Sequence, residues 1–154
     1  MKTDGGLVRL EIQSSFDMLD FVQLVCDHIG EIAGFDEDSL HWIGVAVRES
    51  VINAIKHGNQ EDSAKRVMVE FAFAPAAIPT ELVIRVVDQG RGFDPEIVAN
   101  PLAPENLMRS SGRGIFFMRS FMDDVVLNRM PEGGMEVRLV KNLAGPLAAF
   151  ANRS

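Results

Sequence analysis

The chain has 154 residues, of which 47% are hydrophobic, and this length and composition suit one domain with one core. Its 22 acidic and 15 basic residues give a formal net charge of −7, which argues against a nucleic-acid binder with its usual basic patch. No apolar run approaches the roughly 20 residues of a membrane span, and the first residues lack a signal-peptide core. We therefore expect a single cytoplasmic domain over residues 1–154, with a core from about 7 to 140 and a short tail, bound to neither nucleic acid nor membrane.

The first half of the chain predicts a strand followed by two helices. Leu7–Gln13 alternates apolar and polar residues, as a strand with one buried face does. Ser14 is predicted to cap the next helix, which Gly34 ends. A second helix begins near Asp36, and its apolar residues recur at helical spacing until Gly58.

The second half predicts four more strands, from alternating or continuously apolar runs. These strands span Arg66–Phe73, Glu81–Val87, Val125–Met130 and Met135–Val140. A proline-broken loop, Asp94–Ser111, and a short apolar helix, Ile115–Met122, separate the two pairs. Short turns between successive strands imply antiparallel pairing. The order predicts an α/β fold, a two-layer sandwich of a mixed, mostly antiparallel sheet with helices on one face.

A few isolated residues carry smaller predictions. Cys26 is the only cysteine, so an internal disulfide is excluded, and its apolar helical surroundings predict a core position. His28 and His41 have no partners at metal-ligand spacing and are predicted to be surface or partly buried residues. Trp42 precedes Glu49 by two turns, so it would lie either beside a pocket there or at an interface. The Phe and Met residues between 116 and 122 are predicted to be core.

The end of the second predicted helix carries a polar pair. Glu49 and Asn53 are four residues apart, so they stack on the side opposite the apolar stripe, with Lys56 beside them and His57 toward one edge. A carboxylate and a carboxamide one turn apart can hold a hydrated cation, or a water, against a phosphate. A solvated polar face would show the same spacing. Gly58 is expected to end the helix in a left-handed conformation.

A second motif, Asp88-Gln-Gly90-Arg-Gly92-Phe93, follows a buried strand. An ionised aspartate can only accept hydrogen bonds, so it suits an exocyclic amine such as that of adenine. The two glycines let the backbone approach a flat ring and take unusual dihedral angles. An ordinary turn is the alternative explanation of this motif.

A third motif, Ser110-Ser111-Gly112-Arg113-Gly114-Ile115, opens a helix. Backbone N–H groups at a helix start form an anion site, to which Arg109 and Arg113 could add charge. A flexible loop followed by a helix cap is the alternative. Neither glycine pair matches the dinucleotide fingerprint or the Walker loop.

Together and in this order, the three motifs resemble the N box and the two glycine boxes of the ATPase/kinase superfamily that includes DNA gyrase, MutL-type repair proteins and histidine kinases. Within it, the chain is similar to the stand-alone anti-sigma-factor serine kinases of bacteria, over roughly residues 7–140. The matching residues are Glu49, Asn53, Ala54, His57, Gly58, Asp88, Gly90, Gly92, Phe93, Gly112, Arg113, Gly114 and Ile115, with Met118 and Asp123-Asp124-Val125 after them. The resemblance implies the histidine-kinase-like ATPase fold, also called the Bergerat fold, with its left-handed crossover.

The same resemblance implies roles for individual residues. Glu49 would be the base that deprotonates a serine hydroxyl, Asn53 would ligate Mg²⁺, and Asp88 would bind the adenine amine. ATP or ADP would be bound by Asn53, His57, Asp88, Gly90, Gly92, Phe93, Arg109, Gly112, Arg113, Gly114 and Ile115.

In this family such proteins hold a sigma factor and phosphorylate an antagonist protein. The resemblance therefore implies an ATP- and Mg²⁺-dependent protein serine kinase and anti-sigma regulatory factor of bacterial transcription, which could also form a homodimer. A non-enzymatic ATP-binding interaction module is an alternative, because binding residues and base occupy one site. A histidine-kinase catalytic domain is a weaker alternative, because no helix pair with a phosphoacceptor His precedes Leu7.

Overall fold

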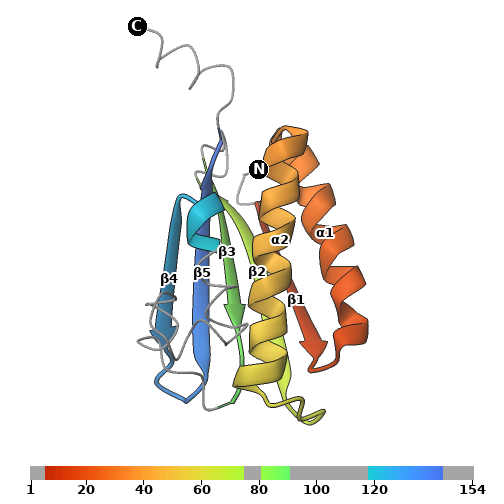
Figure 1. Cartoon of the computed structure of the whole chain (residues 1–154), viewed down its shortest axis with the longest axis vertical. Helices are drawn as coiled ribbons and strands as arrows, with labels where there is room; N and C mark the ends of the chain where they lie inside the picture. The colour runs from red at the N-terminus through yellow and green to blue at the C-terminus, as the bar shows by residue number, and fades with distance from the viewer. Residues whose placement is uncertain (1–5, 75–80, 91–117, 144–154) are drawn as a thin grey trace, which may run out of the picture.

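The computed structural model describes residues 6–74, 81–90 and 118–143, which form a single sheet covered by helices (Figure 1). Its strands are β1 (Leu7–Gln13), β2 (Arg66–Ala74), β3 (Glu81–Val87), β4 (Asp124–Arg129) and β5 (Met135–Asn142). They are ordered β1-β2-β3-β5-β4, and the four pairings between described strands are all antiparallel. The predicted two-layer α/β sandwich is confirmed.

Two long helices, α1 (Leu19–Ala33) and α2 (Glu37–Asn53), lie side by side on one face of the sheet (Figure 1). Gly34 ends α1 as predicted, with φ of 97° in the left-handed region that glycine tolerates. Asp36 caps α2, because its carboxylate accepts a 2.7 Å hydrogen bond from the backbone N–H of Ser39. No described helix is long and apolar enough to cross a bilayer.

The predicted cap at Ser14 is wrong by one residue. A short 3-10 turn precedes α1, and the Ser15 hydroxyl caps it by accepting a 3.3 Å hydrogen bond from the N–H of Asp17. Ser14 instead continues the inward-facing alternation of β1. It is 5% exposed and donates a 2.8 Å hydrogen bond to the carbonyl of Lys65.

The predicted left-handed end of the second helix at Gly58 is also wrong. After Asn53 the helix widens into a π-helical turn, η2 (Ala54–Gly58), in which Asn59 N–H bonds the Ala54 carbonyl at 2.7 Å. The left-handed residues come later, at Gln60 and Glu61, with φ of 52° and 57°. Such π turns are rare and often mark functional sites.

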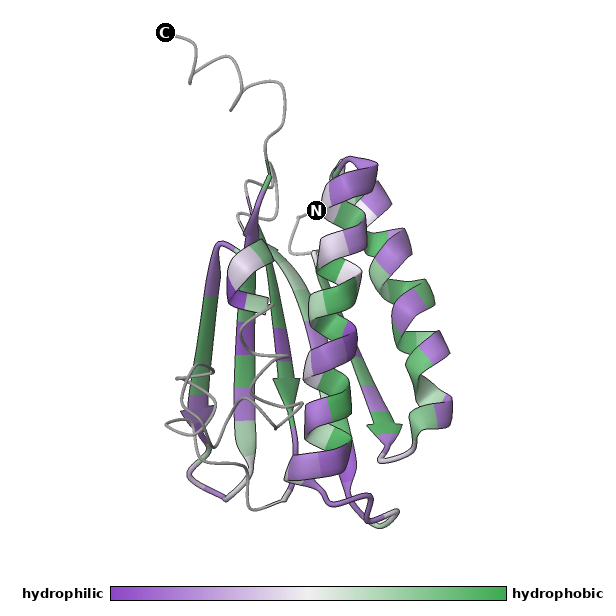
Figure 2. Cartoon of the chain, in the orientation of Figure 1, coloured by the Kyte–Doolittle hydropathy of each residue, from purple (hydrophilic) through white to green (hydrophobic). Residues whose placement is uncertain are grey.

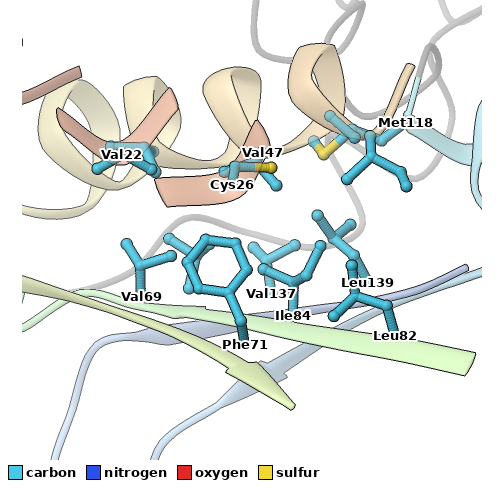
Figure 3. Packing of buried hydrophobic residues seen from close by; sticks show 14 of the residues in the cluster. Val22, Cys26, Val47, Val69, Phe71, Leu82, Ile84, Met118, Val137 and Leu139 are labelled. Atoms are coloured by element: carbon cyan, nitrogen blue, oxygen red, sulfur yellow. The ribbon is translucent and has the colours of Figure 1, made fainter. Parts of the chain in front are cut away.

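The core fills the space between the two layers (Figure 3). From the helical layer, Val22, Cys26, Val47 and Met118 point toward the sheet. From the sheet, Val69, Phe71, Leu82, Ile84, Val137 and Leu139 point back toward the helices. Each such fully buried side chain contributes about 1.5–3 kcal/mol. The core prediction for Cys26 is confirmed, and burial, with a smaller effect of Asp27, raises its pKa to about 12.

Hydrophilic residues interrupt the hydrophobic strands along their length (Figure 2), and several of them form a chain of polar contacts on the face of the sheet opposite the helices. Glu70 accepts from Arg9 at 2.7 Å and from Arg85 at 3.0 Å, and Arg85 also pairs with Glu136. Burial alone would raise the pKa of Glu70, but the two arginines hold it below its ordinary value. Ion pairs across neighbouring strands therefore join this face of the sheet.

Candidate functional site

Asp88 follows β3 directly and is buried, with 3% of its surface exposed. Its Oδ1 accepts hydrogen bonds from the backbone N–H groups of Gly90 at 3.0 Å and Met135 at 3.2 Å. Burial raises the pKa of this carboxyl group, and the two N–H groups and nearby Lys65 oppose that rise only in part. No described residue donates a hydrogen bond to Oδ2, so this oxygen can accept one from a ligand.

Three glycines pack together around Asp88, and two of them, Gly58 and Gly134, come from segments distant in sequence. A Cβ atom at Gly58 would lie 2.2 Å from Asp88 Oδ2, and one at Gly134 would lie 2.2 Å from the Asp88 carbonyl oxygen. A Cβ atom at Gly90 would lie 1.6 Å from the carbonyl oxygen of Gly58. Only glycine lets these backbones approach so closely.

This packing corrects the predicted reason for a glycine at position 90. Its φ is not among the positive values, so close approach to Gly58, and not an unusual dihedral angle, requires glycine there. The sequence did not single out Gly134, because the pair Gly133-Gly134 suits an ordinary hairpin turn between β4 and β5. The same turn in fact holds Asp88 from the opposite side.

Asn53, at the last position of α2, is 2% exposed, and its Nδ2 has no hydrogen-bond partner. It therefore does not belong to a solvated polar face, which was the alternative explanation of the motif. A half-turn of the amide exchanges nitrogen and oxygen at nearly the same positions, so Oδ1 can present itself where Nδ2 lies. Mg²⁺ prefers oxygen ligands, keeps several waters and needs few protein groups. An amide oxygen turned into the position of Nδ2 would fit that requirement.

Glu49 lies one helical turn before Asn53 and is half-buried. Within the described ranges, no residue forms a hydrogen bond or ion pair with its carboxylate. His57 lies in η2 and is also half-buried, whereas Lys56 is exposed. The predicted polar pair therefore lies on one helix. The carboxylate of Glu49 has no partner among the described residues, and the amide of Asn53 one turn later is buried.

An open cavity of about 380 Å³ adjoins Asp88 on the side of the β4–β5 hairpin. Its lining residues are Val87, Asp88, Gln89, Met130, Glu132 and Gly133. Glu49 and Asn53 are not among them. The volume lies in the range of small-molecule sites, so there is room beside the carboxylate for a flat ring.

Seven predicted nucleotide-binding residues lie outside the described residues: Gly92, Phe93, Arg109, Gly112, Arg113, Gly114 and Ile115. The helical segment that follows them is described, and two contacts hold it against α2. The Ser50 hydroxyl lies 2.9 Å from the sulfur of Met118, and Phe121 stacks on Trp42 with ring centroids 3.7 Å apart. The predicted core positions of Met118 and Met122 are confirmed, whereas Phe121 is only partly buried. Trp42 therefore lies against this segment.

Asn59 is a second residue near Asp88 that the sequence did not single out. It is 0% exposed and hydrogen-bonded to the residue that follows Asp88. A polar residue directly after Gly58 gives no signal of burial in the sequence, because that stretch also suits an exposed turn.

The sheet, the helix-borne polar pair and the buried aspartate define an ATPase-type domain, and comparison with known proteins agrees. The sequence profile of the histidine kinase-like ATPase domain matches residues 16–141, so the chain belongs to this family.

More particular relatives are serine-protein kinases. The chain is 26% identical over 147 residues to serine-protein kinase RsbW of Staphylococcus epidermidis, covering 92% of this chain and 89% of that one. It is 26% identical over 133 residues to serine-protein kinase RsbW of Listeria monocytogenes serotype 4a, covering 82% of each. The predicted resemblance to the anti-sigma-factor serine kinases is confirmed.

A solved structure supports the same fold. The crystal structure of the RsbU and RsbW domains of Rv1364c from Mycobacterium tuberculosis matches with a TM-score of 0.63 at 18% identity. The match covers 89% of this chain and 32% of that chain, so this chain spans about a third of its length.

Proposed function

We propose that the protein is an ATP- and Mg²⁺-dependent protein serine kinase that also binds its protein partners tightly enough to regulate them. The observation that carries the proposal is Asp88, a buried carboxylate that backbone N–H groups hold through one oxygen, while no described residue donates a hydrogen bond to the other. The relatives named serine-protein kinases support the type of reaction. A serine on a partner protein would be the acceptor.

Asp88 would select the base of the nucleotide. Its Oδ2 would accept the hydrogen bond of the adenine amine, at about 1.5–3 kcal/mol for a charged acceptor. Guanine presents a carbonyl at the corresponding edge, and two acceptors repel. The backbone bonds to Oδ1 fix the direction of the carboxylate, so this preference needs no rearrangement on binding.

The α2 residues would serve phosphate transfer. Asn53 would hold Mg²⁺ through its amide oxygen, and the cation would supply charge neutralisation at the phosphates. Glu49 would accept the proton of the serine hydroxyl while the hydroxyl oxygen attacks the terminal phosphorus and ADP leaves. Its carboxylate is available for this role because no described residue engages it. His57, Gly90 and the seven residues outside the described ranges complete the proposed nucleotide site.

The partners would be those of the anti-sigma kinases. The protein would bind a sigma factor and phosphorylate an antagonist of that complex, so the state of the nucleotide would influence partner choice. A homodimer is compatible with this role. The similarity to proteins named RsbW over most of both chains supports these partner classes.

Two measurements on the wild-type protein test the proposal. Calorimetry with ATP, ADP and GTP should show a clear preference for the adenine nucleotides, and equal affinity for GTP would contradict the role of Asp88. Radiolabelled phosphate should then pass from ATP to a serine of a partner protein that co-purifies from the native cell. ATP binding with no transfer to any such partner would show a regulatory module without kinase activity.

A further inference from the structure

We propose that Asn59 is a positioning residue that holds Asp88 in its nucleotide-selecting orientation, an inference that rests on the proposed function of Asp88. Asn59 touches neither the carboxylate of Asp88 nor the polar pair on α2 by any hydrogen bond. It acts through Gln89, the residue that follows Asp88.

The side chain of Asn59 is completely buried and all of its polar groups are used. Its Nδ2 donates to the Ser14 hydroxyl at 2.7 Å and to the Arg66 carbonyl at 3.0 Å. Its Oδ1 accepts the backbone N–H of Gln89 at 2.8 Å. One amide therefore joins the end of β1, the start of β2 and the turn after β3 to the end of η2.

Gln89 is held at two points by this arrangement. While its N–H bonds Asn59, its side-chain Oε1 accepts the N–H of Arg66 at 2.7 Å. Asp88 thus lies between a β3 residue fixed in the sheet and a Gln89 fixed by Asn59. Its own N–H bonds the Met135 carbonyl at 3.1 Å. The main chain on both sides of the carboxylate is therefore fixed.

The chemistry of the neighbours specifies an amide at position 59. The Ser14 hydroxyl donates its proton to the Lys65 carbonyl at 2.8 Å, so toward residue 59 it can only accept. The Arg66 carbonyl can only accept as well, whereas the Gln89 N–H can only donate. A side chain at this position must supply two donors and one acceptor, and among short side chains only asparagine does so.

The close contact between Gly58 and Gly90 transmits any movement of this segment to Asp88. A Cβ atom at Gly90 would lie 1.6 Å from the Gly58 carbonyl and 3.0 Å from the Asn59 N. Asp88 Oδ2 packs directly against Gly58. If the Asn59 bonds are lost, the two backbones can separate, and the open oxygen of Asp88 no longer points in a fixed direction.

The test compares Asn59→Ala with Ser14→Ala, a control in the same network. Asn59→Ala removes the bond to Gln89, whereas Ser14→Ala removes one partner of Nδ2 and leaves that bond intact. Dissociation constants for ATP and GTP are measured by calorimetry, and stability is measured by urea unfolding. Asn59→Ser, a milder change that is too short to reach Gln89, is measured in the same way in case Asn59→Ala does not fold.

We expect the Asn59 variants to bind ATP on the order of tenfold more weakly, as the loss of about one hydrogen bond implies, with little change for GTP. Ser14→Ala should lose stability and keep the wild-type ratio of ATP to GTP affinity. An unchanged ratio in a folded Asn59 variant would overturn the inference and leave the proposed function intact. A wild-type protein that does not prefer ATP would overturn both.

Discussion

The region around Asp88 and the polar face of α2 differ in how far their polar groups are hydrogen-bonded. Around Asp88, backbone N–H groups occupy one carboxylate oxygen, three glycines allow close packing, and Asn59 is fully hydrogen-bonded. On α2, the amide nitrogen of Asn53 is buried without a partner, and no described residue engages Glu49. The main chain around Asp88 is held by hydrogen bonds and close packing, whereas on α2 both polar side chains have unused hydrogen-bonding capacity.

This difference indicates a division of work within the site. A recognition group gains from rigidity, because a fixed acceptor discriminates between bases without reorganising. Groups that act on a metal-bound phosphate need free lone pairs, and leaving a buried polar atom unpaired costs about 1–3 kcal/mol. We infer that the unpaired polar groups on α2 lower the stability of the fold and serve ligand binding. The region around Asp88 contributes to stability as well as to selectivity.

The largest expected effect comes from Glu49→Gln, which keeps the size of the side chain but removes the base. Phosphate transfer to the partner serine should fall by about 10²–10⁴-fold. Binding of Mg²⁺–ATP and of the partner should stay near wild type, and so should stability, because no described residue depends on this carboxylate. Radiolabel transfer measured beside an ATP titration checks this. Normal transfer by the variant would show that the base is another residue.

Gly90→Ala should disrupt the close packing around Asp88 by adding a single methyl group. Its Cβ would lie 1.6 Å from a backbone oxygen, which cannot move aside as a side chain can. Overpacking of this kind costs about 1–3 kcal/mol, which urea unfolding would detect, and ATP binding should weaken with it.

Gly44→Ala in α2 is the matched control, since its Cβ would meet only the ends of two side chains, Gln23 at 3.3 Å and Asp27 at 4.0 Å. Alanine also favours a helix more than glycine does, so this variant should be as stable as wild type or more stable. If both variants lose stability equally, the packing around Asp88 is not special.

Asn53→Ala tests the polar face of α2 in the same comparison. Because the nitrogen of this buried amide has no described partner, its removal should raise the free energy of unfolding without nucleotide by up to about 1–3 kcal/mol. The part of ATP affinity that depends on Mg²⁺ should largely disappear. Thermal unfolding with and without Mg²⁺–ATP measures both, because ligand binding raises the apparent stability. Superimposable Mg²⁺ titrations of variant and wild type would place the metal ligand elsewhere.

Periodicity and turn residues sufficed to predict the layers, the strands and the order of the elements. Apolar alternation in β2 and β3 reflects burial on one face of a sheet, and this rule depends on local sequence alone. Glu49, Asn53 and Asp88 could be proposed as site residues from the sequence, because their spacing matches a family, and the structure buries Asn53 and Asp88.

The failures were all tertiary in origin. Ser14 and Ser15 are equally good caps in sequence, and only the direction of β1 decides which one turns inward. Gly58 resembles a helix terminator, yet it is glycine because the Asp88 carboxylate packs against it. Asn59 and Gly134 act on Asp88 across long sequence separations, which no local pattern records.

The smallest expected effect is a pH dependence of stability that originates at Asp88. Burial raises the pKa of this group in the folded protein above its ordinary value of 3.8, although the backbone bonds oppose the shift. An acid whose pKa is higher in the folded than in the unfolded state binds protons more tightly when folded. Its ionisation therefore destabilises the fold, with no cost below the ordinary value and the full cost above the folded pKa.

Asp88→Asn removes that cost, and its amide oxygen can still accept from Gly90 and Met135. The free energy of unfolding of the variant minus that of wild type should be larger at pH 7 than at pH 3. This difference should grow as the pH rises from 3.8 to above the folded pKa. Comparing the two proteins cancels the titration of all other groups, so urea unfolding at several pH values isolates the effect. The variant should still bind ATP about 1.5–3 kcal/mol more weakly, because the charged acceptor is gone. A difference in stability that does not depend on pH would mean that Asp88 ionises as easily in the folded protein as in the unfolded chain. The carboxylate would then behave as a solvated group. The contrast between a closely packed Asp88 region and the unpaired polar groups on α2 would fail.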